Sequence, residues 1–213
     1  MIARSLVAAA TIALLATGCS RSGEIDASGG ITAVRSACPA VGVPAGAGDI
    51  TLFTSPTART ADAIDVVATI TNVRATCNDG GDPIYSAITF DVLARRTRTD
   101  AARDVTLPYF STVVQGGTAV VAKRLGQVTV RFAAGQDRAQ ASATAGASVD
   151  RAAATLPQEV RDQITRQRKA GQEDAAVDPL TNPAVRQAVL RATFEALVGF
   201  QLTDEQLRYN ATR

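Results

Sequence analysis

The sequence contains no histidine and no tryptophan, and its 213 residues include only three tyrosines, six phenylalanines and three cysteines. The missing histidine excludes a Ser-His-Asp triad, a Cys-His pair and histidine-ligated metal sites. Aromatic residues make up 4% of the chain, which argues against a lectin or a glycosidase, because such sites stack sugars on aromatic rings. Paired carboxylates remain possible as catalytic groups.

Net charge is also low. The chain has 22 Lys and Arg against 20 Asp and Glu, which gives a net charge of +2. A nucleic-acid-binding domain presents a basic face, so this balance argues against nucleic acid as a partner. The sequence points to no cofactor and no metal, and we expect neither.

The first residues, MIARSLVAAATIALLATGC, have the pattern of a secretory signal. One charge, Arg4, precedes an apolar stretch from Leu6 to Ala16, and small residues follow. This stretch is too short for a membrane-spanning helix, which needs about 20 residues. The sequence therefore predicts export from the cytoplasm.

A cysteine follows the small residues, where an ordinary signal peptide requires none. Ala16-Thr17-Gly18-Cys19 resembles the lipobox of bacterial lipoproteins. The resemblance implies a diacylglyceryl group on the Cys19 thiol, removal of residues 1–18 as a signal peptide, and acylation of the new amino terminus. Because Ser20 rather than Asp follows, it also implies the outer membrane, with the domain facing the periplasm. The alternative is a plain secretory signal with a chance cysteine.

Two further cysteines, Cys38 and Cys77, remain when Cys19 is set aside. An exported chain lies in an oxidising compartment, where an even pair of cysteines forms a disulfide. We therefore expect a Cys38–Cys77 disulfide. The alternatives are a zinc site and a catalytic thiol. A zinc site needs more ligands than two cysteines, and a catalytic thiol needs a histidine base, which the chain lacks.

Alternation of apolar and polar residues predicts a series of β-strands. The strand candidates are 49–54, 63–77, 84–98, 105–114 and 118–133. The alternation slips near Asn72, which predicts a β-bulge, and Pro108 predicts an edge position or a bulge. Residues 138–150 are ambiguous, since their alanine content favours a helix. Alanine at every second position favours a strand, and we predict a strand there.

Beyond Asp150 the pattern changes to that of helices. A polar amphipathic helix is expected over 157–170. A second helix begins at Pro183 after the capping residue Asn182, and we expect it to run to Phe200. A capping box, Thr203-Asp204-Glu205-Gln206, starts a final short helix.

These elements predict an α+β fold with four parts. Residues 1–18 are the signal peptide, and 19–48 are the lipidated cysteine and a flexible tether. Residues 49–150 form an immunoglobulin-like antiparallel β-sandwich, and 151–213 form C-terminal helices.

Two clusters of polar residues are candidate binding sites. An anion patch for phosphate, lipid head groups or lipopolysaccharide consists of Arg95, Arg96, Arg98 and Arg103. The alternative is a solvated strand end. Asp79 and Asp82 in the turn NDGGDP could bind calcium through oxygen ligands, but such residues are also ordinary turn formers.

No motif identifies a reaction, and we consider three hypotheses for the function. The first is a non-enzymatic envelope lipoprotein that is anchored by its lipid and binds or supports another envelope protein. The alternative is a carrier of a small apolar or anionic ligand between the sheet and the helices. A hydrolase that uses carboxylates alone would need a pair about 5–10 Å apart, and nothing in the spacing indicates one.

Overall fold

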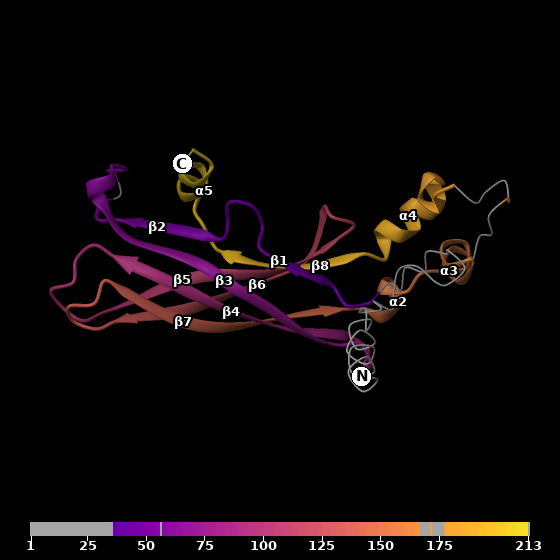
Figure 1. Ribbon diagram of the computed structural model, residues 1–213, viewed down its shortest axis with the longest axis horizontal. Coiled ribbons are helices and arrows are strands. Elements are labelled where there is room, and N and C mark those ends of the chain that lie inside the picture. The colour runs from indigo at the N-terminus through magenta and orange to yellow at the C-terminus, as the bar shows by residue number, and fades with distance from the viewer. Residues whose placement is uncertain (1–35, 56, 167–170, 172–176, 213) are drawn as a thin grey trace, which may run out of the picture.

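The computed structural model describes residues 36–55, 57–166, 171 and 177–212. In these ranges eight strands form two four-stranded sheets that pack as a β-sandwich, with short helices near the C-terminus (Figure 1). The β3–β4 sheet has the order β2-β3-β4-β7, and its strands are Asp49–Phe53, Ile64–Asn78, Ile84–Arg96 and Arg138–Val149. The β5–β6 sheet has the order β1-β8-β5-β6, and its strands are Ala40–Gly42, Phe194–Phe200, Arg103–Gln115 and Ala119–Phe132.

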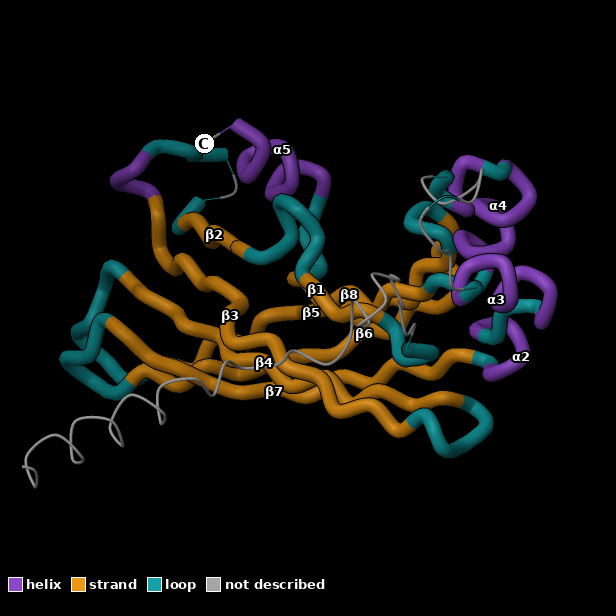
Figure 2. The backbone as a smooth tube through the Cα atoms, turned by 45° about the vertical axis from the view of Figure 1, so that its right-hand side comes forward, coloured by secondary structure: helices purple, strands orange, loops and turns teal. Residues whose placement is uncertain are grey.

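The helical elements of the described chain are short. They are η1 (Ala61–Ala63), α2 (Arg151–Ala154), α3 (Gln158–Thr165), η2 (Pro179–Thr181), α4 (Pro183–Arg191) and α5 (Asp204–Thr212). Figures 1 and 2 show α5 beside β2, and α2, α3 and α4 together at the end of the sandwich where β8 begins. Both predicted caps are formed: the Asn182 side chain accepts from Ala184 N, and Thr203 and Gln206 bond reciprocally.

The core lies between the two sheets. In β4 alternate residues are buried, and Ile84, Ile88, Phe90 and Val92 face inward. The opposite sheet contributes side chains such as Leu107, Val130, Phe132, Val198 and Phe200. The period of two that predicted the strands is therefore the period of burial.

Two ambiguous sequence features are confirmed. Residues Arg138–Val149 form strand β7, so the alternation of alanine prevails over its helix propensity. The register of β3 against β4 shifts between Thr71 and Arg74, where Asn72 has a φ of 53°. The bulge is held by the Asn72 side chain, which donates to Asp91 at 2.7 Å. The pKa of Asp91 is lowered by hydrogen bonds to its carboxylate, of which the bond from Ser142 contributes most and the bond from Asn72 less.

The predicted long helix from Pro183 to Phe200 is wrong in its second half. Helix α4 ends at Arg191, and Phe194–Phe200 is strand β8, which pairs with β1 and β5. FEALVGF alternates as a strand, and its inward residues, Phe194, Ala196, Val198 and Phe200, fill the core. Burial of these side chains between the sheets outweighs any tendency of helix α4 to continue into this segment. The C-terminal region therefore contains a core strand as well as helices.

Pro108 also lies elsewhere than expected. Strand β5 is interior, between β8 and β6, and its register shift falls at Val113/Val114. Pro108 is tolerated because the β8 ladder ends at the pair Tyr109–Phe200, one residue away. Its carbonyl accepts from Gln201 N at 2.9 Å, so the missing N–H faces the end of the ladder.

The short strand β1 was not expected. Residues 19–48 are predicted as lipidated cysteine and tether, but Ala40–Gly42 pair in parallel with Glu195–Leu197 of β8. All the other strand pairs of the described chain are antiparallel. This pairing fastens the beginning of the folded chain to the β5–β6 sheet.

The left-handed backbone at Asn72 gives a test of the bulge. We expect Asn72→Val to lower the free energy of unfolding by about 1–3 kcal/mol, because a β-branched residue is strained at positive φ. Asn72→Gly relieves that strain and loses only the exposed bond to Asp91, so it should change stability by less. Urea denaturation of both variants measures the difference, and equal losses would contradict the assignment of the strain to this backbone position.

Candidate functional site

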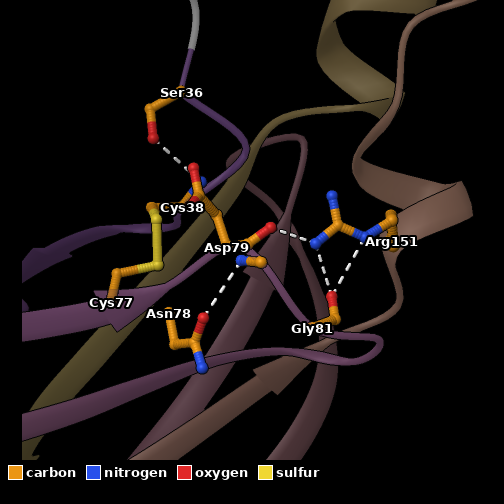
Figure 3. The surroundings of a disulfide bond; sticks show 8 residues. Ser36, Cys38, Cys77, Asn78, Asp79, Gly81 and Arg151 are labelled. Atoms are coloured by element: carbon orange, nitrogen blue, oxygen red, sulfur yellow. Dashed lines mark hydrogen bonds between the residues drawn. A yellow bond between two sulfur atoms is a disulfide. The ribbon is translucent and has the colours of Figure 1, made fainter.

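The described chain begins beside a disulfide. Cys38, which precedes β1, is bonded to Cys77 near the end of β3, and this confirms the predicted pair (Figure 3). The Ser36 hydroxyl accepts from Cys38 N at 3.1 Å. The cross-link joins the start of one sheet to the end of a strand in the other, so it fixes the place where the preceding chain meets the sandwich.

The adjacent β3–β4 turn is held by an arginine. Arg151 of α2 donates from Nε to the Gly81 carbonyl at 3.0 Å, and its Nη2 donates to the carbonyls of Asp79 and Gly81 (Figure 3). The Asp82 carboxylate accepts from Arg151 N at 3.4 Å. Two backbone carbonyls of the turn that contains Asp79 and Asp82 are thus bonded to a guanidinium. Among the described residues no group of three or more His, Cys, Asp or Glu side chains could hold a metal ion.

Cys19, the predicted lipidation site, lies outside the described residues. Within the described ranges no helix is long and apolar enough to cross a membrane.

The four arginines of the predicted anion patch lie at the opposite end of the sandwich, but they have different roles. Arg96 is 3% exposed, and its guanidinium donates to three backbone carbonyls at 2.7–2.9 Å, those of Ala101, Ala133 and Gln136. Its Cζ lies 5.0 Å from the centre of the Phe132 ring, a cation–π distance. Arg96 therefore joins two loops to the end of β4 and directs its donors inward.

Arg103 is paired with Asp65 of β3. Two hydrogen bonds of 2.9 and 2.7 Å join the guanidinium to both carboxylate oxygens, a bidentate geometry. These bonds hold the pKa of Asp65 below its ordinary value, with smaller contributions from the charges of Arg103, Arg98 and Arg96. The same bonds raise the pKa of Arg103. Because the pair links β3 to β5, it joins the two sheets.

The remaining cations of this end are exposed. Arg98 is exposed, and Arg95 lies 3.5 Å from Asp137, which is also 3.9 Å from Arg138. Arg138 was not among the predicted patch residues, although it faces Arg95 in the β4–β7 register. Predicting the pairing of strands 84–98 and 138–150 would have found it. An external anion would meet Arg98 and the two arginines that flank Asp137, Arg95 and Arg138. Arg96 and Arg103 are instead bonded within the fold.

Three of the depressions on the described surface do not lie between the sheets and the helices. A depression of about 620 Å³ lies on the outer face of the β3–β4 sheet, around Val67, Leu93 and Gln140. A smaller one of about 350 Å³ lies between α3 and η2, around Asp162 and Pro179. Another, of about 540 Å³, is lined by residues of α5 and by Arg59. All three are open, so they differ from the enclosed cavity that a carrier of apolar ligands would use.

One surface feature was missed by the sequence analysis. Residues 119–125 of β6, AVVAKRL, are all exposed, including Val120, Val121 and Leu125. Strand β6 is an edge of its sheet. The signal was present in the sequence, because this segment lacks the alternation seen in the buried strands.

The disulfide gives the first test of this end of the molecule. In the loop-entropy model, a cross-link between residues 39 apart in sequence stabilises the fold by about 4 kcal/mol. Replacing both cysteines, Cys38→Ser with Cys77→Ser, should lower the free energy of unfolding by about that amount in urea titrations. Reductant should have the same effect on the parent chain and none on the double variant. An unchanged midpoint in both cases would contradict a stabilising cross-link.

The Asp65–Arg103 pair gives a second test, because replacing its two members should lower the free energy of unfolding by different amounts. Arg103→Met leaves the buried Asp65 carboxylate without its cation, and we expect a loss of about 2–3 kcal/mol at pH 7. Asp65→Asn leaves a half-exposed guanidinium that water solvates, and we expect about 1 kcal/mol.

The pH dependence follows from the lowered pKa of Asp65. The pair stabilises the fold above the ordinary pKa of 3.8, and this contribution disappears as the pH falls through the lower folded-state pKa. The deficit of Arg103→Met should therefore shrink below about pH 4. Thermal unfolding between pH 7 and pH 2 measures it, and a deficit independent of pH would count against an ionic origin.

The polar groups and the disulfide at the two ends of the sandwich thus join strands and loops to one another. The disulfide and Arg151 do so at one end, and Arg96 and the Asp65–Arg103 pair do so at the other. Comparison of the chain with protein-family models, with curated proteins and with solved structures finds no match.

Proposed function

We propose that the protein is a lipid-anchored, non-enzymatic module of the cell envelope, attached through Cys19 to the periplasmic face of the outer membrane. The observation that carries the proposal is the Cys38–Cys77 disulfide, because such bonds persist in oxidising compartments outside the cytoplasm. It agrees with the export signal and with the lipobox-like Ala16-Thr17-Gly18-Cys19. Two or three acyl chains give stable membrane attachment, at about 0.8 kcal/mol for each buried CH₂ group.

A binding or structural role, rather than catalysis, is supported by how the polar groups are used. Three described groups have a clearly shifted pKa: Asp65, Asp91 and Arg103. Each shift arises from side-chain hydrogen bonds that hold strands or a bulge together. Perturbed groups that face a cleft would be the signature of an active site. The proposed partner is another component of the envelope.

We also propose that the sandwich is immunoglobulin-like. A constant-type immunoglobulin domain has sheets ABED and CFG. If β3, β4, β5 and β6 are taken as strands D, E, F and G, then β7 and β8 take the places of B and C. Support comes from the antiparallel neighbours D–E, E–B, F–G and C–F, which correspond to the pairs β3–β4, β4–β7, β5–β6 and β5–β8. The chain order would then be a circular permutation of the immunoglobulin order.

Labelling with palmitate tests the anchor directly. In a Gram-negative host we expect the parent chain to incorporate labelled palmitate and to sediment with the outer membrane. Cys19→Ser removes the acylated thiol and should abolish the label. Cys38→Ser is the matched control, since it removes a different cysteine and should keep the label.

Mass spectrometry of the amino-terminal peptide completes this test, because acylation and cleavage before residue 19 change its mass together. A parent chain that carries no acyl group, or a Cys19→Ser chain that keeps the label, would exclude the anchor. Acylated protein in the inner membrane would exclude the outer-membrane location alone.

A further inference from the structure

The most exposed apolar side chains of the described surface are gathered on one short segment. Val120, Val121 and Leu125 of β6 are 62%, 52% and 70% exposed. Lys123 and Arg124 lie between them and are exposed as well. Among the described residues neither cation forms an ion pair; the Lys123 ammonium lies 5.1 Å from the centre of the Phe110 ring. We call residues 120–125 the β6 patch.

Helix α4 places residues of the same two kinds beside the β5–β6 turn. Its C-terminal end is fastened to the β5–β6 turn, because Gln115 donates to the Arg191 carbonyl at 2.6 Å and Gly116 N donates to Thr193 O at 2.9 Å. Leu190 is 40% exposed there, and Arg191 is exposed. Apolar groups flanked by cations are the composition of surfaces that bind the interface of an anionic membrane.

The β6 patch lies near the beginning of the described chain. Ala40 of β1 pairs with Glu195, Glu195 pairs with Val114, and Val114 pairs with Val120. This row crosses three strand spacings, so Ala40 and Val120 are about 15 Å apart. The nearest acid in the row is Glu195, which is half-buried in the interior of the sheet.

The chain between Cys19 and the described residues is long enough to let the β6 patch reach a bilayer that holds Cys19, but it does not require that contact. Residues 20–35 separate Cys19 from the folded chain and can span at most about 55 Å. A surface held this close to a bilayer has a high effective concentration, so a weak contact is enough to set the orientation of the domain.

We propose that the β6 patch binds the anionic phospholipid head groups of the membrane to which Cys19 anchors the chain, and so lays the β5–β6 hairpin against the bilayer. This inference rests on the proposed lipid anchor. A second copy of the chain is the weaker occupant for two reasons. The bulge beside Val121 interrupts the ladder that strand addition needs, and antiparallel pairing of two patches would bring Lys123 and Arg124 of both copies together.

The absence of tryptophan makes a site-specific test available. Leu125→Trp places a single tryptophan in the β6 patch. Leu93→Trp is the matched control, because Leu93 is also exposed but lies in the other sheet. The full acylated chain is reconstituted in vesicles of phosphatidylglycerol and brominated phosphatidylcholine, with vesicles of brominated phosphatidylcholine alone as the reference. Circular dichroism and an intact disulfide confirm that each variant is folded.

We expect the tryptophan emission of Leu125→Trp to shift to the blue and to be quenched by the brominated lipid, and that of Leu93→Trp to do neither. Adding Lys123→Glu and Arg124→Glu to the Leu125→Trp variant should reduce the contact equilibrium at least about 25-fold, since each cation contributes about fivefold near an anionic surface. Quenching should therefore disappear in this triple variant, and also when Leu125→Trp is measured in high salt.

The ways in which this test can fail are distinguishable. A chain that carries no acyl group and stays out of the vesicle fraction overturns both the anchor and this contact. A Leu125→Trp chain that floats with the vesicles while its tryptophan remains unquenched overturns the contact and leaves the anchor standing. Quenching that survives charge reversal, or that is equal in vesicles without phosphatidylglycerol, overturns recognition of anionic head groups.

Discussion

The pairing of β8 with β5 supports most of the other contacts in this fold. Strand β8 is the partner of β1, so the beginning of the folded chain is attached to the β5–β6 sheet through it. Its inward side chains, Phe194, Ala196, Val198 and Phe200, complete the core opposite the β3–β4 sheet. Removing such a strand would expose the apolar area of two sheets to water, at roughly 25 cal/mol for each Å² of apolar surface. The strand comes from the last quarter of the sequence, so the sandwich is complete only when the C-terminal region has returned to it.

The arginines of this protein illustrate a second constraint, which concerns the turns rather than the sheets. A guanidinium offers several N–H donors in a fixed plane, so it can satisfy more than one carbonyl of a turn at once. Arg96 does this for the loops at one end and Arg151 for the β3–β4 turn at the other. A basic cluster in the sequence therefore contains both fastening and exposed residues. For this reason the exposed cations that face solvent are a different set from the four that are close in sequence.

The proposed anchor, the disulfide and the β6 patch together define an orientation of the domain. The disulfide fixes where the chain enters the sandwich, and the row of paired residues from Ala40 to Val120 places the exposed apolar and basic side chains at the same end. In the proposed arrangement the opposite end, with Arg96 and the Asp65–Arg103 pair, is directed away from the membrane. Surfaces there, and the outer face of the β3–β4 sheet, would be the ones available to another envelope component.

The sequence by itself determined the strands whose side chains alternate, the disulfide pair, the bulge at Asn72 and the helix caps, because each of these depends on residues close together in the chain or on a pair with no competitor. It also predicts an export signal, since targeting depends on local composition. The tertiary structure decided that FEALVGF is a strand. A short apolar segment is compatible with a helix or a strand, and here pairing with β1 and β5 selects the strand. It also decided which arginines are bonded inside and which face solvent, and it left residues 119–125 uncovered. These outcomes depend on which distant carbonyls, carboxylates and sheets approach a residue, and local pattern carries no information about that approach.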